Sequence, residues 1–115
     1  MPTDPKILLE LPPMATSPLE IARLWHVSTS HITDADSRIL HDECPYIGVL
    51  AYKEGWWINV PDGPDLTDEL LNALLTYGLS PCVGHILTVA RSHLCDWVRL
   101  DADAPVYDFL PQYEW

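Results

Sequence analysis

Four runs of apolar and β-branched residues along the chain have the length and composition typical of β-strands. In the last run Trp97 and Arg99 alternate with Val98 and Leu100, as expected for a strand whose two faces meet different surroundings. The four predicted strands cover residues 21–29, 47–52, 56–60 and 96–101.

The segment between the second and third runs predicts the tight turn of a β-hairpin. Lys53 and Glu54 are polar, and Gly55 stands where a three-residue hairpin loop needs a positive φ. Because the runs on both sides of this turn are β-prone, we expect them to pair as antiparallel neighbours.

A first helix is predicted to begin near Thr33. Thr33 followed by Asp36 is close to a capping box, in which each residue bonds the backbone N–H of the other. Asp34 and Asp36 also suit the positive end of the helix dipole. Ile39 and Leu40 provide an apolar side that can face a core.

Two further helices are predicted back to back in the second half of the chain. Residues 66–77 carry leucines at helical spacing, and Gly78 follows them as a C-cap. Ser80 is then expected to be an N-cap and Pro81 the first residue of a helix that runs to about Leu94.

The resulting order, β-α-β-β-α-α-β, predicts an α+β fold with a small four-stranded sheet, mixed or antiparallel, and helices packed on one face. A length of 115 residues suits one hydrophobic core. We therefore expect a single domain over residues 21–115, preceded by a proline-rich extended arm over residues 1–20. An apolar run at residues 7–11 of the arm suggests packing along the domain edge or against a second copy, so a homodimer is one alternative.

Acidic residues outnumber basic ones by 17 to 6, which gives a formal net charge of −11. Binding nucleic acid through its phosphates requires a basic surface, so direct binding of nucleic acid is not expected. The same charge disfavours an anionic membrane surface, and no apolar run approaches the roughly 20 residues of a membrane-spanning helix. A basic protein is the partner that this charge attracts.

The cysteines and the first residues of the chain predict a cytoplasmic location. Cys44, Cys82 and Cys95 are odd in number and lack CxxC spacing, which favours reduced thiols over a disulfide framework. The first residues lack the cationic and apolar regions of a secretory signal. No HExxH or paired-cysteine pattern is present, so neither a metal nor a cofactor is expected.

Three segments, taken in order, resemble a family of small acidic bacterial proteins of unknown function that occurs in genomes and mobile elements. The segments are STSHIT at residues 28–33, GWWINVP at residues 55–61, and DADAP at residues 101–105 with the terminal LPQYEW at residues 110–115. The resemblance spans roughly residues 25–115. It implies an ordered small domain with no assigned activity.

The first functional hypothesis is an acidic protein-interaction module. Trp56 and Trp57 are adjacent on a strand and must point to opposite faces, so one of them faces outward. With acidic neighbours, such an aromatic side chain suits the anchor of an interface with a basic, nucleic-acid-binding protein. In its most concrete form the protein is a mobile-element inhibitor of a host defence system, of the anti-CRISPR or anti-restriction type, that mimics nucleic acid. The predicted partner-binding residues are Asp62, Asp65, Asp68, Glu69, Trp56, Trp57 and Trp115.

The alternative hypothesis is a small hydrolase or transferase. His31 lies at the junction of the first strand and its helix, where an imidazole within reach of a serine activates it as a nucleophile. Asp101 and Asp103 would orient His31, or hold a cation with it, if the last strand lies beside the first. Structural explanations stay open for all of them, namely a braced turn around His31 and a solvated acidic turn before Pro105. The residues of this alternative site are Ser28, Ser30, His31, Asp34, Asp101 and Asp103.

Overall fold

The computed structural model of the protein describes residues 19–42 and 44–115, and the predicted arm lies almost entirely outside them. The described chain has the predicted α+β fold and element order, with a short 3-10 helix after the first strand. In chain order the elements are β1 (Leu24–Ser28), η1 (Thr29–His31), α2 (Asp34–Asp42), β2 (Val49–Tyr52), β3 (Gly55–Asn59), α3 (Asp68–Tyr77), α4 (Pro81–Ser92) and β4 (Trp97–Asp101).

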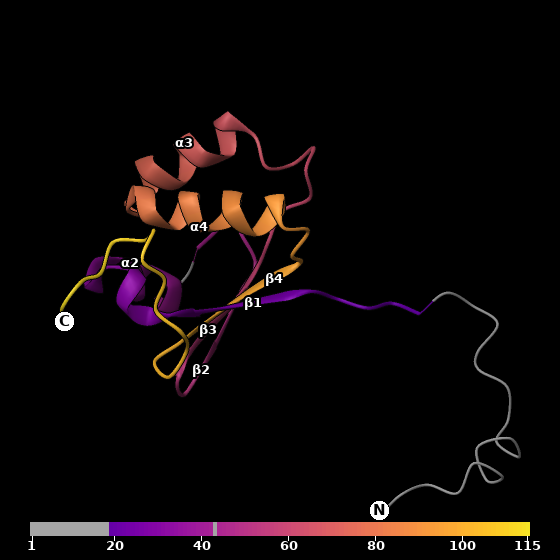
Figure 1. Ribbon diagram of the computed structural model, residues 1–115. Helices are drawn as coiled ribbons and strands as arrows, with labels where there is room; N and C mark the ends of the chain where they lie inside the picture. Colours follow the sequence, from indigo (N-terminus) through magenta and orange to yellow (C-terminus); the bar gives the residue numbers. More distant parts are fainter. Residues whose placement is uncertain (1–18, 43) are drawn as a thin grey trace, which may run out of the picture.

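The four strands form one mixed sheet in the order β1-β4-β3-β2 (Figure 1). β4 lies in the centre, parallel to β1 and antiparallel to β3. The parallel register sets Leu24 opposite Trp97 and Ser28 opposite Asp101. β1 therefore begins at Leu24 rather than at residue 21, because the paired part of β4 starts at Trp97.

The β2–β3 hairpin is present, but its turn differs from the prediction. Tyr52 pairs with Gly55, so the loop contains only Lys53 and Glu54. Gly55 is a strand residue and has no positive φ. A Cβ atom at this position would lie 1.8 Å from the carbonyl oxygen of Leu100 on β4, so the close approach of two backbones is what requires glycine.

The predicted end of α3 at Gly78 and the predicted start of α4 at Pro81 are confirmed, whereas α3 begins at Asp68 rather than at residue 66 and Ser80 does not have its predicted role. Gly78 caps α3 with a φ of 123°, and Thr67 accepts a hydrogen bond from Leu70 N–H at its start. Pro81 is the first residue of α4, but the Ser80 side chain makes no capping bond to that helix. The Ser80 hydroxyl instead donates to a carboxylate oxygen of Asp36 at 2.6 Å.

Among residues 19–42 and 44–115, the helices cover one face of the sheet and none lies on the other. Alternate strand residues, among them Val27, Ile58 and Val98, point to the helical side and belong to one core cluster with Leu40 of α2 and Ile86 of α4. In Figure 1, α4 lies along the sheet and α3 stacks on α4. We call the other side the helix-free face; its side chains include those of Leu24, His26, Leu50, Tyr52, Trp57, Trp97 and Arg99.

The C-terminal segment after β4 returns along the open edge of β1. Ser28 N–H donates to the Pro105 carbonyl at 3.0 Å, and the Tyr107 hydroxyl donates to the His26 carbonyl at 3.0 Å. These bonds occupy part of an edge that would otherwise present unpaired backbone groups. No helix among the described residues is long and apolar enough to cross a membrane.

Candidate functional site

His31 is a buried structural residue and has no ring nitrogen free for chemistry. Its Nδ1 lies 2.7 Å from the Pro111 carbonyl, which can only accept, so Nδ1 carries the proton. Its Nε2 accepts the Tyr107 N–H at 2.9 Å. The side chain is 0% exposed. His31 therefore ties the C-terminal segment to the start of α2 in its neutral form.

The serines of the alternative site bond each other rather than His31. The Ser28 and Ser30 hydroxyl oxygens lie 2.9 Å apart, and Ser28 Oγ also accepts Ser30 N–H at 3.1 Å as the cap of η1. Asp34 forms an exposed ion pair with Arg38 at 2.7 Å. The structure therefore places these side chains near His31 in the chain without forming a serine–histidine hydrogen bond.

Asp101 and Asp103 do not converge on His31, which corrects the expectation of a shared site. β4 ends at Asp101, so the alternation of a strand no longer holds at Asp103, which is exposed in the following turn. Asp101 is buried and accepts the Tyr52 hydroxyl at 2.6 Å and Asp103 N–H at 2.8 Å. Within residues 19–42 and 44–115, no group of three or more histidine, cysteine or carboxylate side chains is placed to hold a metal ion.

Arg99 lies beside Asp101, a contact that the sequence did not indicate. Its Nε donates to the Tyr52 hydroxyl at 3.0 Å, and its guanidinium lies 3.2 Å from the Asp101 carboxylate. The hydrogen bond from Tyr52, followed by that from Asp103 N–H, lowers the pKa of Asp101. Burial, followed by the bond to Asp101, raises the pKa of Tyr52. The network fixes Arg99 on the helix-free face.

The acidic residues of the predicted partner-binding set are all exposed. Asp62 and Asp65 lie in the loop after β3, and Asp68 and Glu69 form the first turn of α3. Asp68 and Glu69 also stabilise that helix, because negative charge favours its N-terminus. Asp62 has a cation nearby, Arg91 at 3.8 Å. The four carboxylates thus lie along one stretch of the chain, residues 62–69, which we call the acidic segment.

The tryptophans of the predicted set separate into three places. Trp56 packs against the core, and Trp57 lies on the helix-free face, as adjacent strand residues require. Trp57 meets Trp97 edge-on at 6.0 Å between ring centroids, with Arg99 above it at 5.6 Å. Trp115 lies apart from them and donates its indole N–H to the Ile32 carbonyl at 2.9 Å. The tryptophan side chains on the helix-free face are therefore a Trp57–Trp97 pair.

The start of η1 and the two ends of the C-terminal segment come together in space. Tyr113 N–H donates to the Ser30 carbonyl at 2.7 Å. A polar hollow of about 190 Å³ opens between these segments, lined by Ser28, Thr29, Ser30, Ala102, Tyr113 and Trp115. Three of the segments that carry the family resemblance therefore lie together around this hollow, namely STSHIT, DADAP and the terminal LPQYEW.

The chain belongs to the DUF5983 family. The family model, described as Family of unknown function (DUF5983) C-terminal domain, matches residues 24–115. The match covers every strand and helix of the described fold. Neither the curated proteins nor the solved structures contain a match to the chain. Membership of DUF5983 thus gives the site no assigned activity.

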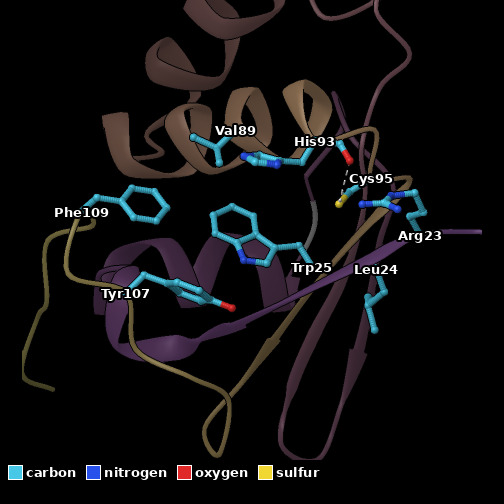
Figure 2. A pocket seen from close by; sticks show the side chains of 8 residues that line it. All are labelled: Arg23, Leu24, Trp25, Val89, His93, Cys95, Tyr107 and Phe109. Atoms are coloured by element: carbon cyan, nitrogen blue, oxygen red, sulfur yellow. Dashed lines mark hydrogen bonds between the residues drawn. The ribbon is translucent and has the colours of Figure 1, made fainter.

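A second hollow of the DUF5983 domain involves residues that sequence reasoning missed. It has a volume of about 360 Å³ and lies between β1, α4 and the C-terminal segment (Figure 2). Trp25, Tyr107 and Phe109 form its aromatic side, with Trp25 and Phe109 nearly parallel at 7°. The sequence indicated this aromatic side only through Tyr107 and Phe109, which alternate with other residues in the tail. The ring that they contact, Trp25, lies more than 80 positions earlier in the chain.

Proposed function

We propose that this DUF5983 domain is an acidic protein-interaction module that binds a basic protein partner. The observation that carries the proposal is the Trp57–Trp97 pair on the face of the sheet that no described helix covers, together with the exposed carboxylates of residues 62–69, which follow the end of β3. Leu50 on the same face is 64% exposed. Aromatic side chains flanked by solvated polar groups suit the centre and the rim of an interface.

The acidic segment begins where the aromatic pair ends. Trp97 is opposite Asn59, the last residue of β3, and Asp62 follows three positions later. From Asp62 the chain leads to the first turn of α3, which stacks on α4 on the helical side of the sheet (Figure 1), so a partner that covers the Trp57–Trp97 pair reaches the carboxylates of residues 62–69 by extending around this end of the sheet. Charges at the rim raise the rate of association and make it sensitive to salt.

In its concrete form the proposal is a mobile-element inhibitor of a host defence system, of the anti-CRISPR or anti-restriction type. Exposed carboxylates would take the positions of nucleic-acid phosphates on a basic enzyme surface. A cytoplasmic location belongs to the same proposal and is supported by Cys44, Cys82 and Cys95, which are all buried free thiols. A homodimer through residues 1–18 concerns a segment outside the described residues.

Capture from a bacterial lysate with matched charge variants tests the proposal. In one variant Asp62, Asp65, Asp68 and Glu69 are changed to lysine. In the control, four exposed acids elsewhere, Glu20, Asp42, Asp108 and Glu114, are changed to lysine, so that the net charge of the two variants is equal.

We expect wild type and the control to retain the same basic protein, and the first variant and Trp57→Ala to lose it. Raising the salt from about 0.1 to 0.5 M should release it, because the Debye length falls well below 10 Å. Equal capture by the two lysine variants would contradict the assignment of the surface. Transformation of a restricting or CRISPR-bearing host, with and without the expressed chain, then tests the inhibitory form of the proposal.

A further inference from the structure

We propose that the hollow between Trp25, α4 and the C-terminal segment binds a small aromatic carboxylate. This site lies on the helical side of β1, because Trp25 points away from the helix-free face that carries Trp57. The inference therefore does not depend on the proposed binding of a basic protein.

The walls of the hollow suit a flat apolar ligand. The Trp25 and Phe109 rings lie 6.1 Å apart at 7°, and Tyr107 meets Trp25 edge-on at 5.4 Å. Val89 of α4 and Cys95 complete an apolar lining (Figure 2). Aromatic rings stack on such surfaces and gain energy beyond the area that they bury.

The size of the hollow limits the ligand. Its volume of about 360 Å³ lies near the lower end of small-molecule sites, which begin at roughly 300 Å³. A ligand of one or two fused rings fits this volume. Phe109 is 57% exposed although it is a large apolar side chain, and a ring placed against it would remove that surface from water.

The charge at the mouth of the hollow selects an anionic group. The Arg23 guanidinium is exposed and bonds none of the residues that the structure describes, while the nearby Asp96 carboxylate accepts the Arg23 backbone N–H. By contrast, Arg38 pairs with Asp34. His93 lines the same hollow. In a chain of net charge −11, an unpaired guanidinium beside an aromatic hollow favours a carboxylate, which the guanidinium binds with two parallel hydrogen bonds.

Calorimetric titration of the full chain with 2-naphthoate tests the site. At the binding free energy per non-hydrogen atom that is usual for small ligands, a ligand of this size binds with a Kd on the order of 1 mM or tighter. The neutral analogue 2-naphthalenemethanol keeps the rings and lacks the charge, so we expect it to bind about tenfold more weakly.

Matched arginine variants separate the charge from the rings. Arg23→Gln should remove the tenfold preference for naphthoate and leave the binding of the alcohol unchanged, whereas Arg38→Gln, with the same change in net charge, should keep the preference. Phe109→Ala should weaken both ligands. Chemical shifts of the Trp25 indole N–H should change on titration.

Three results would overturn the proposal. The first is the absence of saturable binding, and the second is equal affinity of wild type for the two probes. The third is binding of the probes by a full-length Leu8→Asp, Leu9→Asp variant but not by wild type. In that case the N-terminal segment of the wild-type chain would fill the hollow.

Discussion

Gly55 illustrates at the scale of one residue how a correct residue can be predicted for the wrong reason. The sequence indicates a glycine in a loop, where its freedom of φ matters. The structure places it in β3, where the Leu100 carbonyl would collide with any Cβ atom. The reason lies in a strand 45 positions later in the chain, so no local pattern contains it.

Gly55→Ala should therefore lower the free energy of unfolding by about 3 kcal/mol, because the backbone of β4 must shift. Gly48→Ala is the matched control, since its Cβ would lie 3.4 Å from Asn59, an ordinary contact. We expect the control to change stability by less than about 1 kcal/mol. Urea unfolding measures both, and equal losses would contradict the close approach.

Asp101 makes stability depend on pH at the acid end. Its pKa is lowered from its ordinary value of 3.8 in the folded protein, because Tyr52 and Asp103 N–H donate to the ionised carboxylate. Its contribution is therefore complete above the unfolded pKa and is lost as the pH falls through the lowered folded value.

The difference in unfolding free energy between wild type and Asp101→Asn should stay constant from neutral pH down to about pH 5 and shrink below about pH 4. Urea unfolding at several pH values measures this difference. A difference that stays unchanged down to pH 3 would show that Asp101 is not held in its ionised form by these bonds.

At the scale of elements, local sequence signals predicted which helices and strands form, whereas contacts between distant segments decided which elements lie next to each other. The cap at Gly78, the start of α4 at Pro81 and the pairing of the two hairpin strands are properties of short segments, so the sequence was sufficient for them. The reciprocal bonds between Thr33 and Asp36, at 2.9 and 3.0 Å, also confirm the predicted capping box.

Asp36 additionally joins two helices, which the sequence did not indicate. Its carboxylate accepts Ser80 N–H at 2.7 Å and the Ser80 hydroxyl at 2.6 Å, and it is fully buried. The same residue thus holds the start of α2 against the start of α4. A serine predicted to cap its own helix binds the buried carboxylate of a neighbouring helix instead.

Asp36→Ala should cost about 3 kcal/mol or more of unfolding free energy, because several buried donors lose their acceptor. Asp34→Ala removes an exposed ion pair at the start of the same helix and should cost less than about 1 kcal/mol. Thermal and urea unfolding compare the two variants. Similar losses would mean that Asp36 acts only as a helix-terminal charge.

At the scale of the whole molecule, the site depends on the return of the C-terminal segment and on the two unlike faces of the sheet. The return of the C-terminal segment buries His31 and so removes the one imidazole for which a catalytic role was considered. The sheet order sets Trp57 beside Trp97 rather than beside Trp115. Neither arrangement has a signal within a short stretch of sequence, because both join segments that are dozens of residues apart.

The most direct test of the interaction surface is chemical-shift mapping of the isotope-labelled domain with the captured partner. We expect the shifted resonances to belong to Leu50, Trp57, Trp97 and the acidic segment 62–69, and we expect added salt to reduce the shifts. Resonances that shift around helices α2 and α4, with no change on the helix-free face, would contradict it.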